Sequence, residues 1–376
     1  MSKYTRRTFL GTLIGSMGIM GCRDISTLYF PNGNQHSPPT SASVVATNRI
    51  VRAYDPNLND WDYSSNYWED YNNYDNLKNA FEWGLMRLSD TSSMTEAWGL
   101  VLSNYQSGDK VAIKMNMNCY DEDLPNSSPT FARAVTNSLI EYGIPHQDIK
   151  LYDIVRRWPS FWTNKWYGST FNGVEIVDYD NRVLGESFTF PNGAAEQIPT
   201  VVEQANHIIN LSLFKGHKGY VTGAMKNHFG TIHLPSELHI DRHRQIAHLN
   251  SLPFLSKQRL VVCEAALQNY YAEYDPFEPF QKTELFPNGK VSSIFLTTNF
   301  FIMDQVLGDF INFEREERGT YSWANEFLDI ASSEYDLGER EFALLRPGSF
   351  SELDLHYDTI NYVSERATSV TSIPDI

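Results

Sequence analysis

The feature that most constrains the fold is a short apolar strand, a helix and a second apolar strand in direct succession. Lys110–Asn118 reads KVAIKMNMN, Pro129–Tyr142 has a helical apolar period that ends at Gly143, and Ile149–Val155 is the next strand-like run. A strand–helix–strand unit of this length pairs its two strands in parallel through a right-handed crossover. The sequence therefore predicts a parallel sheet.

The same alternation continues on both sides of this unit. Further strands are expected at Arg49–Tyr54, Val174–Tyr179, Ser187–Phe190, His207–Phe214, Arg259–Leu267 and Ser292–Thr298, and helices at Asn76–Leu88, Thr95–Tyr105, Phe300–Arg315 and Ser322–Tyr335. The two strands between residues 174 and 190 are short, which suggests a peripheral excursion. With 41% hydrophobic residues, the chain can bury a large core. We expect an α/β fold with an open, mostly parallel sheet and helices on both faces.

The N-terminus has the features of an export signal. Thr5–Leu10 reads TRRTFL, a twin-arginine motif, and an apolar run without acidic residues follows it. That run is too short and too rich in glycine to span a bilayer, so residues 1–22 are a targeting segment. The segment ends at Gly21-Cys22, which resembles a lipobox with Cys22 as the lipidated residue. Plain cleavage or retention stays open. The twin-arginine translocon is the expected partner, and the periplasm or cell envelope the expected location.

Composition divides the rest of the chain and limits its partners. Residues 23–48 are rich in Pro, Ser and Asn, as a flexible linker would be; residues 49–346 form the α/β domain, and residues 347–376 a C-terminal extension. The formal net charge of −16 argues against nucleic acid as a partner. The three cysteines form no C-x-x-C motif, so an iron–sulfur cluster of its own is not expected.

One strand leads into a loop that is unusually rich in chemically active side chains. Six of the ten histidines and four glycines lie between His207 and His243, together with three lysines. Glycine permits close approach of the backbone to a ligand. Open α/β sheets build their sites at the carboxyl ends of strands, so this loop is the expected site.

Cations gather at the predicted strand ends of an otherwise acidic chain. Because converging cations and glycine-rich backbone amides suit an anion, we expect a small anionic ligand here. The expected ligand-binding residues at these strand ends are Lys114, Asn116, Arg156, Lys215 and Asn227. The alternative is that these lysines are solvated and pair with surface acids at little energetic gain.

The histidines of the loop allow three interpretations. His217 and His228 are flanked by lysines, which should lower their pKa values and leave neutral bases; with Lys226 they form the expected catalytic set. His239 and His243 are four residues apart and would share a face if 237–250 were helical, a spacing that suits a divalent metal. Histidines that face solvent or are satisfied in the core are the third interpretation.

The order of these features resembles the domain-of-unknown-function 362 family over residues 49–318, most specifically from Lys215 to Gly230. The positions that match the family pattern are Lys114, Asn116, Lys215, His217, Lys226, Asn227, Phe229 and Gly230. The family's later Asp-x-x-x-x-Asp pattern runs here from Asn299 to Asp304. The resemblance therefore implies a ligand-binding role for Asp304, with the first aspartate replaced. It implies no reaction.

Two functions remain open from the sequence. The first is an exported α/β enzyme that acts on a small anionic substrate through the Lys, His and Gly-rich loop. The second is a non-catalytic cell-envelope protein that uses the same pocket to hold a ligand or metal, or that serves in maturation. The replacement of aspartate by Asn299 favours the second, while the clustered lysines and histidines are compatible with both.

Overall fold

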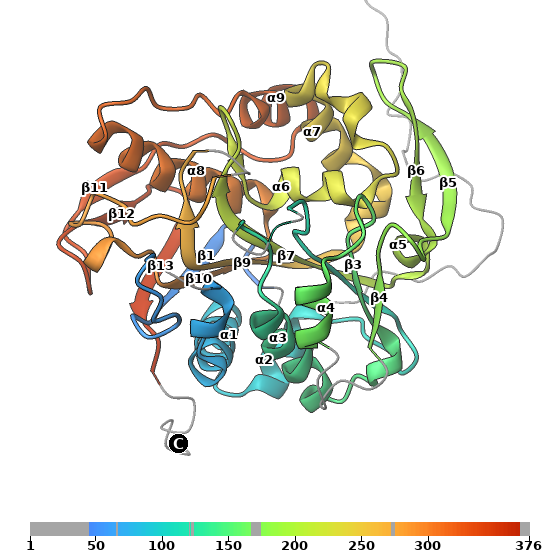
Figure 1. Ribbon diagram of the computed structural model, residues 1–376, viewed down its shortest axis with the longest axis horizontal. Coiled ribbons are helices and arrows are strands. Elements are labelled where there is room, and N and C mark those ends of the chain that lie inside the picture. The colour runs from blue at the N-terminus through green and yellow to red at the C-terminus, as the bar shows by residue number, and fades with distance from the viewer. Residues whose placement is uncertain are drawn as a thin grey trace, which may run out of the picture. The chain divides into compact units, whose positions relative to one another are not determined.

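A single large sheet organises the protein (Figure 1). The computed structural model describes residues 45–64, 67–119, 121, 124–166, 174–271 and 275–368. The expected export signal, Cys22 and most of the linker lie outside these residues. Within the described chain, nine strands form the main sheet. In sheet order they are β13 (Asn361–Arg366), β1 (Arg49–Tyr54), β10 (Ser293–Thr297), β9 (Gln258–Asn269), β7 (His207–Gly216), β2 (Val111–Lys114), β3 (Ile149–Tyr152) and β4 (Glu175–Val177), with β8 (Val221–Thr222) paired to the end of β7.

The central strands are parallel, as the sequence predicted. β7 pairs in parallel with β2 on one side and with β9 on the other, and β2, β3 and β4 are parallel to each other. From β2 the chain continues outward to β3 and β4, whereas from β7 it continues in the opposite direction to β9. The strand order therefore reverses between β2 and β7. Such a switch point opens a crevice at the carboxyl edge of an α/β sheet.

Helices cover both faces of the sheet (Figure 1). The layer on one face contains α1 (Tyr74–Ser89), α2 (Met94–Val101), α3 (Pro129–Tyr142) and α4 (Ser160–Trp166). The layer on the other face contains α6 (Ala224–Asn227), α7 (Arg242–Ser251), α8 (Phe300–Glu317) and α9 (Glu326–Tyr335). The short helix α5 (Thr200–Gln204) precedes β7. The fold is thus the predicted open, mostly parallel α/β sheet.

Alternation along β7 divides its side chains between the two layers. Ile209 and Leu211 pack into the core beneath α1 and α3, while Ile208 and Phe214 pack into the core under α7 and α8. Every residue of β7 is buried. A strand buried on both faces reads as a continuous apolar run, which is why this one was visible in the sequence.

Three details differ from the expected elements. β10 is antiparallel to both β9 and β1, because no α-helix in the described chain carries β9 across to β10. β2 ends at Lys114, since the Asn116 amide donates to Ser127 Oγ at 2.8 Å and leaves the ladder. α9 begins at Glu326 because Asn325, with φ of 49°, adopts a left-handed conformation.

Two outer segments complete the fold. β5 (Leu184–Thr189) and β6 (Ala195–Pro199) form a separate antiparallel hairpin, consistent with a peripheral excursion. At the other edge, β13 lies beyond residue 346 and pairs in parallel with β1, while β11 (Leu344–Arg346) pairs with β12 (Asp354–His356). The buried Arg52 of β1 forms an ion pair with Asp354 at 3.2 Å. The C-terminal residues up to 366 are therefore part of the sheet structure.

Within the described residues, no helix combines the length and apolar character needed to cross a membrane.

Candidate functional site

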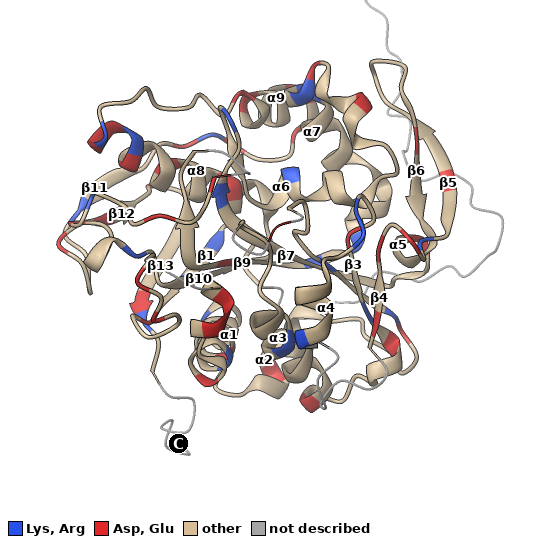
Figure 2. Ribbon diagram, viewed as in Figure 1, with Lys and Arg blue, Asp and Glu red and all other residues tan. Residues whose placement is uncertain are grey.

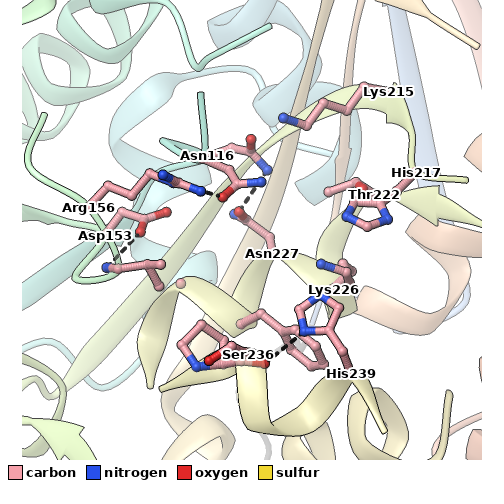
Figure 3. A pocket seen from close by; sticks show the side chains of 15 residues that line it. Asn116, Asp153, Arg156, Lys215, His217, Thr222, Lys226, Asn227, Ser236 and His239 are labelled. Atoms are coloured by element: carbon pink, nitrogen blue, oxygen red, sulfur yellow. Dashed lines mark hydrogen bonds between the residues drawn. The ribbon is translucent and has the colours of Figure 1, made fainter. Parts of the chain in front are cut away.

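A pocket of about 190 Å³ lies at the carboxyl ends of β2, β3 and β7, where the strand order reverses (Figure 3). α6 and the 3₁₀ turns His228–Thr231 and Pro235–His239 close it on the side of α7. Its lining residues are Asn116, Asn118, Asp153, Val155, Arg156, Lys215, His217, Thr222, Lys226, Asn227, Phe229, Gly230, Pro235, Ser236 and His239. The chain segments that follow three parallel strands thus meet in one cavity.

The floor of the pocket is a buried ion pair. Lys114, at the end of β2, donates to Asp153 Oδ2 at 2.9 Å and to the Met115 carbonyl, and it is fully buried. Burial lowers the pKa of Lys114, and the carboxylate of Asp153 opposes that shift. Asp153 also accepts from the Met117 amide at 3.2 Å and from the Val155 amide at 3.3 Å. Its negative charge is therefore already balanced within the protein.

A chain of amides fixes the orientation of the side chains above this floor. Asn210 Nδ2 donates to the Ala224 carbonyl at 2.9 Å, so Asn210 Oδ1 accepts from Asn227 Nδ2 at 2.8 Å. Asn227 Oδ1 must then face Lys114 and Asn116, and it accepts from Asn116 Nδ2 at 3.0 Å. Because a carbonyl only accepts, the first bond determines each amide in turn. Asn116 Oδ1 is left pointing away from this chain.

Two glycines allow the loop to lie close to buried acids. A Cβ on Gly230 would collide with the Asp153 carboxylate and the Lys114 ammonium, while the Gly230 carbonyl accepts from the Ile154 amide at 3.0 Å. A Cβ on Gly223 would collide with Asp304 Oδ1. Glycine at Gly230 therefore lets the loop reach the ends of β2 and β3, and glycine at Gly223 lets it lie against α8.

Three cationic side chains from different segments face the cavity. Lys215 is the penultimate residue of β7, Lys226 lies on α6, and Arg156 follows β3 (Figure 3). Lys215 is 1% exposed and donates to the Pro125 carbonyl at 3.1 Å, whereas Arg156 is half-buried and donates to Asn118 Oδ1 at 3.4 Å. Lys226 is buried, with its ammonium 4.6 Å from the centre of the Phe229 ring. Acidic segments are spread over both helical layers, whereas α6 is basic (Figure 2).

Two imidazoles lie beside these cations. His217 is stacked on Tyr220, with ring centroids 5.0 Å apart. Burial, and then the charges of Lys226 and Lys215, lower the pKa of His217 to about 2. His239 Nδ1 lies 3.0 Å from the Pro235 carbonyl and so carries the proton of that bond, which leaves Nε2 as an acceptor in the neutral ring. His217 is thus an uncharged ring beside at least two positive charges.

A family model for a domain of unknown function, DUF362, matches residues 111–308. The chain belongs to the DUF362 family. No curated protein is significantly similar to it in sequence. The DUF362 match runs from the start of β2 into α8 and includes every residue that lines the pocket. The pocket is thus built entirely from the part of the chain that defines the family.

The structure brings most of the site residues expected from the sequence together. Those that line the pocket are Asn116, Arg156, Lys215, His217, Lys226, Asn227 and His239, with Lys114 directly beneath. The exposed Lys218 and Arg157 do not line it, and Arg157 instead pairs with Asp180. The residues in the pocket follow the carboxyl ends of parallel strands, and these ends lie at the same edge of the sheet, which explains why they come together.

His228 and Asp304 lie behind the lining rather than in it. His228 is fully buried, and its ring nitrogens lie 2.7 Å from Gln258 Oε1 and 3.1 Å from Thr231 Oγ1. Burial lowers the pKa of His228 to about 3. Asp304 accepts from the amides of Ala224 and Met225 at the start of α6, and burial raises its pKa to about 7. Both residues therefore position the loop. For His228 this agrees with the third interpretation from the sequence, a histidine whose hydrogen bonds are satisfied in the core.

The helix that would have placed His239 and His243 on one face is not formed. The 3₁₀ turn ends at His239, Asp241 is left-handed with φ of 56°, and α7 begins only at Arg242. His243 packs edge-on against Tyr220 and lies 3.8 Å from Glu326. Among the described residues, no group of three or more His, Cys, Asp or Glu side chains is arranged to hold a metal ion.

Asp153, Thr222 and Ser236 line the pocket but were not expected there from the sequence. Asp153 could have been found, because it directly follows a predicted strand at the same edge as Lys114. Asn210 also carried a signal, as an amide within an apolar run that is buried on both faces. Thr222 and Ser236 are ordinary loop residues in the sequence, and only the folding of the loop brings them to the pocket.

Proposed function

We propose that this protein binds a small, multiply charged anion in the pocket between β2 and β7. The observation that carries the proposal is Lys215. Its ammonium is buried and donates to a backbone carbonyl, and it forms no ion pair with a carboxylate of the described residues. A buried charge that lacks a counterion is costly, and protein folds retain one where a ligand compensates it.

The charge balance around Lys215 supports an anion with more than one negative charge. Lys226 and Arg156 also face the pocket, while Asp153, the one carboxylate among the described lining residues, is neutralised by Lys114. The low pKa of His217 keeps that ring neutral, so it adds no positive charge to the lining. Three cations that face one cavity favour a phosphomonoester or a dicarboxylate over a singly charged ligand.

The same pocket allows the enzyme alternative through His217. With a pKa of about 2, the ring is a weak base in the unliganded protein. Burial, the main cause of the low pKa, persists in the complex, but a bound anion would offset the lysine charges and raise the pKa, so proton uptake by His217 is favoured there over the free protein. We therefore propose ligand binding as the function, with proton transfer by His217 as an activity that depends on the anion. Export to the cell envelope remains part of the proposal.

A ligand screen on the purified protein tests this function. The panel contains phosphomonoesters, dicarboxylates, monocarboxylates and divalent metals, and thermal shift and calorimetry measure binding to wild type, Lys226→Ala and Lys218→Met. Loss of one charged hydrogen bond costs about 1.5–3 kcal/mol, so Lys226→Ala should bind a dianion about ten- to a hundredfold more weakly. The exposed Lys218 serves as the matched control and should leave affinity unchanged.

Two outcomes would contradict the proposal. In the first, no anion in the panel stabilises the wild-type protein. In the second, an anion binds wild type and Lys226→Ala equally well, which would place its site elsewhere. If only a metal binds, and His239→Ala loses it with the fold intact, the protein would instead be a non-catalytic metal-binding protein.

A further inference from the structure

Two buried polar atoms of the pocket have no hydrogen-bond partner among the described residues. Asn116 and Thr222 are each 4% exposed and line the pocket, yet Asn116 Oδ1 and Thr222 Oγ1 bond to no atom of the described residues. Buried polar atoms are almost always paired, and leaving one unpaired is costly. Both atoms are therefore candidates to contact the ligand.

The two atoms require different groups on the ligand. The amide chain through Asn210 and Asn227 fixes Asn116 Nδ2 as the donor to Asn227 Oδ1, so Asn116 Oδ1 can only accept. A fully deprotonated anion offers no donor to it. Thr222 Oγ1 can donate, and it can therefore bond to an oxygen of the anionic group itself.

We propose that the ligand is a hydroxylated organic anion, whose charged group lies among Lys215, Lys226 and Arg156 and whose hydroxyl donates to Asn116 Oδ1. This inference rests on the proposed anion-binding function and adds a selectivity to it. Asn116 is then a specificity-determining residue. A site built to hydrogen-bond a ligand hydroxyl discriminates against the analogue that lacks it, because the protein's own acceptor stays unpaired.

Matched pairs of ligands test the selectivity. Glycerol 3-phosphate is compared with propyl phosphate, and malate with succinate, by calorimetry at pH 8, where a phosphomonoester is a dianion. Within each pair the charge is the same and the hydroxyl differs. We expect the hydroxylated member of the pair that fits the pocket to bind about tenfold more tightly, which corresponds to about 1.4 kcal/mol.

Variants assign the preference to one side chain. Asn116→Ala should abolish the preference while the affinity for the ligand without a hydroxyl changes by less than about threefold. Asn118→Ala is the matched control, because Asn118 lines the same pocket but its Oδ1 already accepts from Arg156. That variant should keep the preference. Thr222→Val should weaken both members of a pair equally, and it should not destabilise the unliganded protein.

The outcomes separate this inference from the function on which it rests. If no anion of either pair binds, the proposed function fails. If both members of every pair bind wild type within about twofold of each other, anion binding stands and the hydroxyl inference is overturned. A tenfold preference that persists in Asn116→Ala would also overturn it. Should Asn116→Ala fail to fold, the wild-type comparison alone decides.

Discussion

Replacing Lys215 by methionine should separate ligand binding from folding. The side chain is 1% exposed at the end of β7, and among the described residues its ammonium donates only to the Pro125 carbonyl. Lys215→Met retains a long unbranched chain and removes the buried charge. Loss of the hydrogen bond to the carbonyl costs about 1.5–3 kcal/mol, while the desolvation penalty of an uncompensated ion amounts to several kcal/mol.

Without ligand, the lost hydrogen bond and the removed desolvation penalty nearly cancel, or their sum favours the variant. We expect unliganded Lys215→Met to be at least as stable as wild type, and up to about 3 kcal/mol more stable. Anion affinity should fall by about 1.5–3 kcal/mol, or roughly ten- to a hundredfold, because a charged contact to the ligand is lost. A residue retained for stability would show the opposite pattern.

Urea denaturation measures the free energy of unfolding, and calorimetry measures affinity for the best anion of the screen. Lys218→Met is the control, since Lys218 is in the same loop but exposed, and both quantities should stay within about 0.5 kcal/mol of wild type. A Lys215→Met variant whose free energy of unfolding falls by more than about 1 kcal/mol, with anion affinity unchanged, would contradict a ligand-binding role for Lys215.

Three further predictions concern the fold, the pH dependence and export. Ile209→Asp places an unpaired carboxylate in the buried centre of β7 and should lower the free energy of unfolding, measured with urea, by several kcal/mol. Val183→Asp is the control, because Val183 is 62% exposed, and it should lower that free energy by less than about 0.5 kcal/mol. Similar losses in the two variants would contradict the sheet order. The pKa of His217 is lowered to about 2 in the folded protein, so this ring binds a proton in the unfolded chain first as the pH falls. Wild type should therefore lose stability between about pH 6.5 and 2, and His217→Gln should remove up to about 1.4 kcal/mol of that loss per pH unit. Parallel curves of stability against pH for the two proteins would show that the ring titrates normally. Changing Arg6 and Arg7 to lysine should retain the precursor in the cytoplasm with an unchanged melting temperature, and normal export of this variant in cells without the twin-arginine translocon would disprove the signal.

The main sheet could be predicted because its information is local. The apolar runs around Ile113 and Ile209, each followed by a glycine or polar loop, identify strands by residue type alone. A helix between β2 and β3 makes their pairing parallel, and parallel strands end at one edge. These rules place Lys114, Asn116 and Lys215 in the same region without any coordinates, and the structure confirms that arrangement.

The roles of neighbouring histidines could not be predicted in the same way. His217 and His228 are both flanked by lysines in the sequence, yet one ring faces the pocket and the other is buried against Gln258. A turn of a few residues decides the direction of each ring, and the packing around it sets that turn. Likewise, the spacing of four residues suggested that His239 and His243 lie on one helix, but the left-handed Asp241 between them interrupts it.

Strand periodicity and residue type depend only on the local chain, so buried strands that lead into a basic, glycine-rich loop can be recognised without a fold. Which charges are balanced depends on the tertiary structure. Asp153 neutralises Lys114 across two neighbouring strands, Asp304 holds the start of α6 from 80 residues away, and Lys215 is left without a carboxylate among the described residues. Charge balance is a property of distances through space, and those distances exist only once the strands have paired and the helices have packed on them.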